Sequence, residues 1–427
     1  MKRIFKGIIS ILKWTVIILL ALIIILLIVR FTGKLYYNRT PDGGINESMY
    51  LYVNGQEQWI NIYGKDKDYP VLLYLHGGPG GSTSTIDWVV LRKLAKNYTV
   101  VNWDQRGCGK TQIHSPQADT ITPEIMRSDI DTVVNSILEY TGKDNITILG
   151  HSWGTMYGGD YVIRHPEKTD CIIDLSLSLD KDFVAVQHKC VEDYIAGNID
   201  YQTAVDKYGY LPFLYYDFTD KSSCLDSSEK YSKYFEAIKQ ILTDWTVNSE
   251  EDRSLAKEFD ADECTKLMSS SSEEDIRKAN HMFGEIVLPL TDKYVYSNED
   301  NQSGSDVNTV TAVFFNPYYS IADFVKLTFA EDAYSQPVDP ADEKSNDVCS
   351  VLLDDFDLGD KTEYAVPVYV LQGSKDDYCG IIKSYFDRIN APDKELQYID
   401  GGHDSTMMQS EKMAQFVHEI SEKQKSN

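Results

Sequence analysis

The stretch ITILGHSWG, residues 146–154, decides the fold. Three of its first four residues are apolar, as in a strand that is covered on both faces of a sheet. The pattern Gly150-x-Ser152-x-Gly154 follows, and residues 153–164 are predicted to form a helix. A strand, a sharp turn and a helix in this order are typical of a turn that exposes a serine hydroxyl. We therefore expect Ser152 to be a nucleophile; an incidental glycine-bracketed turn is the alternative.

Strand and helix patterns alternate on both sides of this stretch. Two alternating segments flank Asn54-Gly55, a strong hairpin signal. The alternation that follows predicts an α/β fold with a doubly wound, mostly parallel sheet covered on both faces. The expected strands are 49–53, 59–63, 71–75, 99–103, 146–149, 171–177, 364–373 and 395–399, and the expected helices are 123–142, 153–164 and 407–423.

The alternation of strands and helices stops in the middle of the chain. Residues 180–346 are rich in Tyr, Phe, Asp, Glu and Ser, with amphipathic helical stretches and little strand signal. We expect them to form a large helical lid inserted near the carboxyl end of the sheet. The predicted core then consists of residues 49–179 and 347–427.

The N-terminus contains a long apolar segment. Residues 14–29 read WTVIILLALIIILLIV, and about 20 apolar residues cross a bilayer as a helix. We interpret residues 1–31 as an uncleaved transmembrane anchor and residues 32–48 as a tether. A cleaved signal peptide is the alternative, but it would end in a small-x-small site, which the sequence RFTGK at 30–34 does not offer.

Charge is distributed unevenly along the chain. Residues 1–39 hold seven basic side chains and no acidic one, and the rest holds 34 basic and 66 acidic side chains, a net charge of −32. Such a body repels phosphate backbones, so we expect no nucleic-acid partner. The acidity suits an amino-bearing substrate, or is simply a solvated surface.

Slightly more basic residues precede the apolar segment than follow it, which favours a single-pass protein with an extracytoplasmic body.

A serine nucleophile needs a base that is itself oriented. In chains with such a turn, the nucleophile usually comes first in the sequence, followed by the acid and then the histidine. His403 follows the expected strand 395–399 in a Gly-Gly-His-Asp loop, where its ring can reach over the sheet. His165 ends a helix and His418 lies within one, which favours capping and packing roles. We therefore expect His403 to be the base.

The acid is expected after the penultimate strand. Residues 373–377 read Gly-Ser-Lys-Asp-Asp at that place. We prefer Asp376, three residues after the glycine, and Asp377 is the alternative; the other carboxylate is then exposed to solvent.

Three motifs together resemble a known family. HGGPG at 76–80, DQRGCGK at 104–110 and GHSWG at 150–154 are similar to the proline iminopeptidase family of α/β-hydrolase serine peptidases. The resemblance covers the core and is weak across the lid. It implies that the backbone N–H of Gly78 is one oxyanion donor, and the turn itself makes the N–H of Trp153 the other. The resemblance implies that residues 104–110 form a structural loop beside the site, and we assign this loop no chemical role.

The lid departs from the family pattern. Relatives hold the free amino group of the substrate with lid carboxylates, one of them in a helix similar to residues 276–283. Here Ala279 stands where that carboxylate belongs. We expect Glu285, or another acid such as Asp193 or Asp244, to bind substrate in its place; each is otherwise an ordinary surface residue.

The expected chemistry is two-step acyl transfer to water, which needs no metal or organic cofactor. The seven cysteines show neither a C-x-x-C pair nor zinc-type spacing. The expected substrate is a small peptide, cut by an aminopeptidase that releases its first residue. One alternative is an esterase or another acyl hydrolase, and another is a catalytically silent binding protein with a hydrolase fold.

Overall fold

A single sheet organises the part of the chain that the structure describes. The computed structural model describes residues 2–116, 121–179, 181–214, 216–219, 223–270, 272–291, 293–294, 304–338, 346–376 and 379–426. The sheet has the strand order β1-β2-β4-β3-β5-β6-β7-β8. Its strands are β1 (Ile45–Val53), β2 (Gln56–Gly64), β3 (Val71–Leu75), β4 (Thr99–Trp103), β5 (Ile146–His151), β6 (Thr169–Leu175), β7 (Val368–Gly373) and β8 (Lys394–Ile399).

The sheet is mostly parallel. β1 and β2 form the expected hairpin, and β2 pairs antiparallel with β4. Every other neighbouring pair is parallel. The predicted doubly wound, mostly parallel sheet is therefore confirmed. Parallel strands share one carboxyl edge, so the loops after β3, β5, β7 and β8 lie along the same side of the molecule.

Helices cover both faces of the sheet. One face packs against α4, α5, α15 and α16, and the other against α2 and α18. The helices of the core and the N-terminus are α1 (Lys2–Tyr37), α2 (Asp87–Leu94), α3 (Gly109–His114), α4 (Pro123–Thr141), α5 (Trp153–Arg164), α15 (Val348–Phe356), α16 (Cys379–Arg388), α17 (Ser405–Met408) and α18 (Ser410–Ser426), with a short 3-10 turn at Pro166–Lys168.

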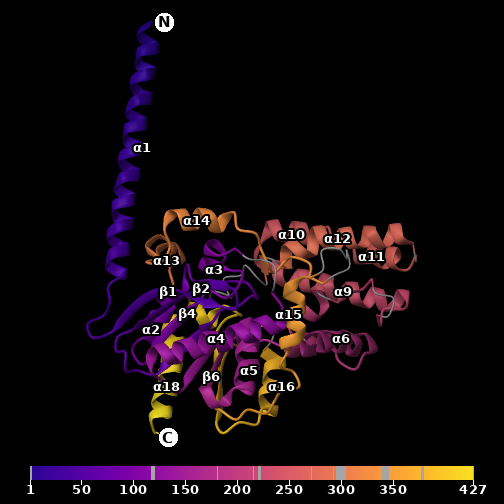
Figure 1. The fold of residues 1–427 in the computed structure, drawn as a ribbon. Coiled ribbons are helices and arrows are strands. Elements are labelled where there is room, and N and C mark those ends of the chain that lie inside the picture. Colours follow the sequence, from indigo (N-terminus) through magenta and orange to yellow (C-terminus); the bar gives the residue numbers. More distant parts are fainter. Residues whose placement is uncertain are drawn as a thin grey trace.

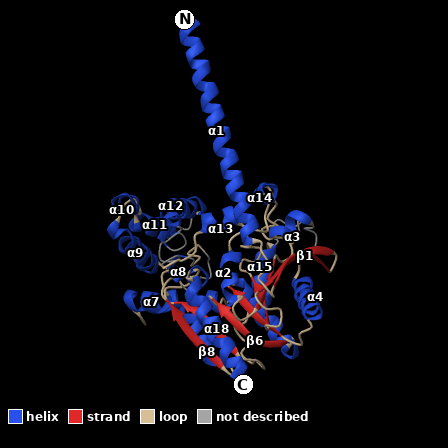
Figure 2. Ribbon diagram, turned by 90° about the vertical axis from the view of Figure 1, so that its left-hand side faces the viewer, coloured by secondary structure: helices blue, strands red, loops and turns tan. Residues whose placement is uncertain are grey.

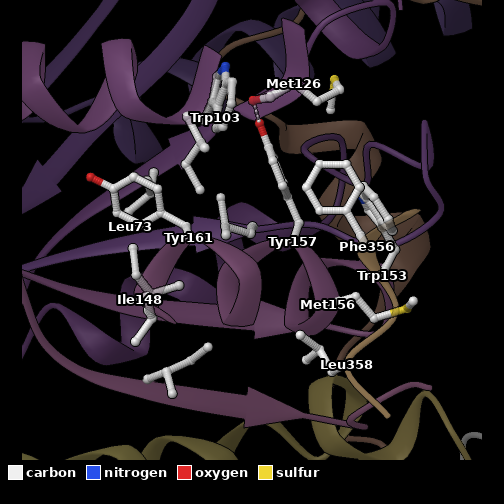
Figure 3. Close-up of a cluster of buried hydrophobic side chains, with 14 of the residues drawn as sticks. Leu73, Trp103, Met126, Ile148, Trp153, Met156, Tyr157, Tyr161, Phe356 and Leu358 are labelled. Carbon is white, nitrogen blue, oxygen red and sulfur yellow. Dashed lines mark hydrogen bonds between the residues drawn. The ribbon is translucent and has the colours of Figure 1, made fainter. Parts of the chain in front are cut away.

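Helix α5, which follows Ser152, is fixed by aromatic packing. Figure 3 shows Tyr157 of α5 beside Phe356 and Trp153. The ring centroid of Tyr157 lies 5.6 Å from that of Trp153 and 5.5 Å from that of Phe356. The Tyr157 hydroxyl points at the N-terminal part of α4 and donates a hydrogen bond to the Met126 carbonyl at 2.5 Å. Aromatic rings packed in this way bury large apolar areas, so the start of α5 is held firmly against the sheet.

Between β6 and β7 the chain forms a helical insertion, defined here as α6 to α14. Figure 2 shows it on one side of the sheet, and α6 to α12 share a hydrophobic core of their own. Its helices are α6 (Lys181–Ala196), α7 (Tyr201–Tyr208), α8 (Leu211–Leu214), α9 (Ser228–Trp245), α10 (Glu250–Ala256), α11 (Ala261–Met268), α12 (Glu273–Thr291), α13 (Thr309–Phe315) and α14 (Ile321–Thr328), with a 3-10 turn at Thr246–Asn248.

Helix α1 projects away from the rest of the molecule (Figure 1). Its segment Ser10–Tyr37 is long and apolar enough to cross a membrane, and the apolar side chains along it are exposed. This agrees with an anchor and equally with a signal sequence.

The C-terminal helical segment differs from expectation. One helix was expected over residues 407–423, but α17 ends at Met408 and α18 begins at Ser410. Asp306, from the insertion, caps α18: its carboxylate accepts the N–H groups of Ser410 at 3.2 Å and Glu411 at 2.9 Å. A carboxylate at a helix N-terminus satisfies unpaired N–H groups and so stabilises the break.

Candidate active site

Ser152 lies in a strained turn between β5 and α5. Its backbone has φ 53° and ψ −123°, a conformation that residues other than glycine rarely adopt. The flanking glycines explain how the turn fits. A β-carbon on Gly154 would lie 2.0 Å from the Leu75 carbonyl oxygen, and one on Gly150 would lie 2.5 Å from that of Gly154. The turn therefore requires glycine at both positions and presents the Ser152 side chain at the carboxyl edge of the sheet.

The loop after β3 touches Ser152. A β-carbon on Gly77 would lie 3.2 Å from the Ser152 β-carbon. Gly78 follows with φ 117° and is exposed, so its backbone is accessible beside the serine. Trp153 is buried and is the first residue of α5. Its N–H is one of the first-turn groups that have no acceptor within the helix. Gly77, the residue before Gly78, thus lies against Ser152 across space, and Trp153 follows Ser152 along the chain; the two oxyanion donors stay a prediction.

Asp104, at the end of β4, holds this loop in place. It is buried, and its carboxylate accepts the hydroxyls of Ser82 at 2.6 Å and Ser84 at 3.1 Å, and the N–H of Lys110 at 2.6 Å. Asp104 and Lys110 belong to the segment to which we gave no chemical role. The structure assigns Asp104 a positioning role, and the signal in the sequence is an acid directly after an apolar strand.

His403 and Asp376 lie in contact. His403 Nδ1 lies 2.8 Å from Asp376 Oδ2. An ionised carboxylate can only accept, so this hydrogen bond places the proton on Nδ1 and makes Nε2 the proton-accepting nitrogen. The loops that carry the pair are tied together, since the N–H of Ser374 donates to the Ile399 carbonyl at 2.8 Å and that of Lys375 to the Gly401 carbonyl at 2.9 Å. Asp377, the alternative acid, lies outside the described residues.

Gln372 supports Asp376, a role that was not predicted from the sequence. Its side-chain amide donates to Asp376 Oδ2 at 2.7 Å, and both residues are buried. A second donor on the same oxygen fixes the direction of the carboxylate toward His403. The available signal was a lone glutamine at the end of the apolar strand VYVLQG.

The His403 ring lies beside the turn that carries Ser152. The ring centroids of His403 and His151, the residue before Ser152, are 5.6 Å apart. The Ser176 hydroxyl, at the end of β6, donates to the His403 carbonyl and so fixes its backbone. Burial, followed by the nearby His403, lowers the pKa of His151 to about 3. His151 is therefore neutral at physiological pH and adds no charge beside His403.

The expected substrate-binding acids lie on helices of the insertion. Glu285 is 71% exposed, and its carboxylate lies 3.9 Å from His281, one turn earlier on α12. Asp193 pairs with Lys189 at 2.9 Å, and Asp244 accepts the Tyr201 hydroxyl at 2.8 Å. Ala279 is fully buried in the core of the insertion. Substrate binding by Glu285 stays a prediction.

Metal-ligating side chains are not clustered in the described part of the chain. Within it, no group of three or more His, Cys, Asp or Glu residues could hold a metal ion. Among the described cysteines, Cys108, Cys171, Cys224 and Cys264 are free thiols.

The core of this chain is similar to known hydrolases. Residues 70–407 match the family model described as alpha/beta hydrolase fold. "Probable aminopeptidase YbaC" of Bacillus subtilis (strain 168) is 32% identical over 119 residues, which are 27% of this chain and 37% of the relative. A proline iminopeptidase of Lactobacillus delbrueckii subsp. lactis is 34% identical over 122 residues, 28% of this chain and 40% of the relative.

The matches to these curated relatives span about two fifths of the relatives' own length. Among solved structures, the crystal structure of VinJ aligns over 89% of this chain and 98% of its own, with 15% identity and a TM-score of 0.47.

Proposed function

Because this chain belongs to the alpha/beta hydrolase fold family, we propose that it is a serine hydrolase with Ser152 as nucleophile, His403 as base and Asp376 as orienting acid. The observation that carries the proposal is the 2.8 Å contact of His403 Nδ1 with Asp376, with the His403 ring beside the turn that exposes Ser152. Burial and the hydrogen bond from Gln372 keep the carboxylate in one orientation.

The reaction proceeds in two steps. Ser152 Oγ attacks the substrate carbonyl while His403 Nε2 takes the hydroxyl proton. The oxyanion accepts hydrogen bonds from the N–H groups of Gly78 and Trp153, and the positive end of α5 adds to its stabilisation. His403 then returns the proton to the leaving group, which departs from an acyl-enzyme. Water, deprotonated by His403, attacks the acyl-enzyme and releases the acid and Ser152. These groups perform acid–base and nucleophilic chemistry without a cofactor.

For the substrate, we propose a short peptide with a free N-terminus, so that the protein is an aminopeptidase of proline iminopeptidase type. The motifs of the core and the partial identity to proline iminopeptidases support this. The insertion supplies a lid that blocks longer chains, and the net charge of −25 favours an ammonium group.

One observation favours an esterase or another acyl hydrolase instead. Ala279 occupies the position of a family carboxylate and is fully buried in the insertion core, while Glu285 points to solvent. An ammonium group in a closed site needs a paired carboxylate, since an unpaired charge there costs much of the binding energy. An ester substrate makes no such demand.

A single assay separates the two substrates. The full chain in detergent is offered a prolyl arylamide, its N-acetylated form and a short-chain aryl ester, with Ser152→Ala as the blank. An aminopeptidase loses most of its rate on acetylation, because a site built for an ammonium group is left with an unpaired carboxylate. Equal rates on both amides, or turnover of the ester alone, would overturn the aminopeptidase proposal and leave the serine hydrolase intact.

We also propose that α1 anchors the protein in a membrane with its body extracytoplasmic. The length and apolar surface of Ser10–Tyr37 support the anchor, and the basic residues before it support the orientation. Protease added to intact cells that express the chain should remove the body and leave a short membrane stub. Full protection would reverse the orientation, and a mature N-terminus near residue 35 would show a cleaved signal peptide.

A further inference from the structure

The C-terminal part of α1 rests on α13 and the start of α14. The Arg30 guanidinium donates to the carbonyls of Val313 at 3.3 Å and Tyr319 at 3.2 Å, and the Lys34 ammonium donates to the Tyr319 carbonyl at 3.1 Å. Both views of the molecule show α14 on the side of the body from which α1 projects (Figures 1 and 2). The surface beside α1 is therefore formed by α13 and α14.

This surface is apolar. Ile321, Val325 and Phe329 are 51%, 53% and 82% exposed, and none of the residues of α14 is buried. Ile321 and Val325 lie in α14 and Phe329 directly follows it, so the three side chains, at intervals of four, form a single stripe along the helix and its C-terminal end. Val310 on α13 is 79% exposed as well. We call these four side chains the apolar stripe. Lys326, also exposed, lies next to it on α14.

The apolar stripe is rigidly attached to the core. The Tyr319 hydroxyl, just before α14, donates to Asp104 at 3.1 Å and lies 2.8 Å from the Ser84 hydroxyl. Asp323 of α14 pairs with Lys110 at 3.5 Å. The orientation of the stripe relative to α1 is thus set by contacts to α1 on one side and to the loops beside Ser152 on the other.

We propose that the apolar stripe inserts into the headgroup–acyl boundary of the same bilayer that α1 crosses. This inference rests on the proposed anchor. The bilayer is the occupant that the geometry favours, because Arg30 ends the apolar run of α1 and contacts α13, so the membrane surface lies at the level of α13 and α14. An amphipathic helix with a lysine at its edge is suited to this boundary, where the ammonium group reaches the headgroups.

The loop that carries Gly77 and Gly78 is then held close to the bilayer. Ser84, at the end of that loop, hydrogen-bonds Tyr319, two residues before α14. A substrate that partitions into the membrane surface is thereby brought near Ser152.

Photo-crosslinking of the full chain tests the inference. The protein is placed in phosphatidylcholine nanodiscs that contain a lipid with a diazirine on its acyl chain, and the adducts are mapped by mass spectrometry after irradiation. We expect adducts on α1 and on the peptide that contains residues 321–329. The double variant Val325→Asn/Phe329→Asn should lower the adduct yield on that peptide several-fold. Tyr398→Asn, which changes an exposed side chain on β8, should leave it unchanged.

The possible outcomes distinguish a failure of the proposed membrane contact of the apolar stripe from a failure of the proposed α1 anchor. Adducts on α1 alone overturn the inference and leave the anchor intact. Chain that is extracted by alkaline carbonate and carries no adducts overturns the anchor and the inference with it. Crosslinks from residues 321–329 to a second copy of the chain, in place of lipid, overturn the inference in favour of a dimer interface.

Discussion

His403 Nδ1 lies 2.8 Å from Asp376 Oδ2, and the two side chains differ strongly in exposure, 28% for the histidine and 2% for the aspartate. Gln372 donates a second hydrogen bond to the aspartate, and the imidazole ring lies 5.6 Å from that of His151, the residue before Ser152. A buried, ionised acid behind a partly exposed histidine orients the ring and stabilises the imidazolium that forms during proton transfer.

Removing the charge of Asp376 should abolish most of the activity. We expect Asp376→Asn to lower kcat by about four orders of magnitude, because an amide donor favours the wrong tautomer of His403. The assay is steady-state hydrolysis of the best substrate in the arylamide and ester set. Asp377→Asn and Asp400→Asn, the latter in a solvent-exposed carboxylate before His403, should keep nearly the full rate. Loss of activity in Asp377→Asn with an active Asp376→Asn would reverse the choice of acid.

The buried ion pair of Arg106 with Asp129 should be important for stability. Arg106 Nε and Nη2 donate to the two Asp129 oxygens at 2.7 and 3.0 Å, and Gln58 donates to Oδ2 at 2.7 Å. Arg106→Met leaves a buried carboxylate without its partner and should cost about 3–5 kcal/mol. The double variant Arg106→Met/Asp129→Leu should recover much of that loss in urea unfolding. Additive losses would contradict the account.

Asp87 should make stability depend on pH. Burial raises the pKa of Asp87 from 3.8 to about 7, against the hydrogen bond donated by Thr83. Between these values the folded protein holds a proton that the unfolded chain has released. Stability due to this group is therefore full at pH 4 and falls by up to about 1.4 kcal/mol per pH unit until pH 7. Asp87→Asn should flatten the pH dependence of the unfolding free energy between about pH 4 and pH 7; unfolding free energies of the two proteins that change in parallel across this range would exclude the assignment.

A carboxylate at position 279 should destabilise the insertion rather than bind substrate. Ala279 is fully buried among the apolar side chains of α6 to α12. Ala279→Glu should therefore cost about 2–5 kcal/mol in thermal or urea unfolding, through overpacking and a buried charge. Gly284→Glu on the same helix is the matched control, since no atom lies within 4 Å of its β-carbon position. An unchanged stability with a gain in aminoacyl arylamide hydrolysis would mean that position 279 faces the substrate.

The sequence predicted the parts of the fold that local patterns encode. β3, β4 and α5 match the expected ranges, because buried strands and a glycine-bracketed turn leave continuous signals. β1 begins at Ile45, four residues before the expected start, because its pairing with β2 continues through Asn46 and Glu47, which break the apolar alternation. Such extensions depend on the partner strand and leave no local signal.

Contacts between residues far apart in the sequence could not be predicted from local sequence patterns. Asp306 caps α18 from over 100 residues away, which no local pattern indicates. Gln372 supports Asp376 through the fold of one loop, and Asp104 ties the loop of Gly78 to α3 and to Tyr319, two residues before α14. His403 and Asp376 could be proposed from the sequence because chain order and strand ends limit the candidates, whereas the residues that support them depend on tertiary packing.

The most direct test of the account is covalent labelling of Ser152. The full chain, in detergent or in native membranes, is treated with a fluorophosphonate, which reacts with activated serines. We predict stoichiometric labelling of the wild type and of Ser374→Ala, an exposed serine in the loop of Asp376, with the adduct on Ser152 by mass spectrometry. Ser152→Ala should show no labelling while it keeps the circular dichroism and melting temperature of the wild type. Labelling that persists in Ser152→Ala, or a folded wild type that does not react, would contradict the account and favour a binding protein with a hydrolase fold.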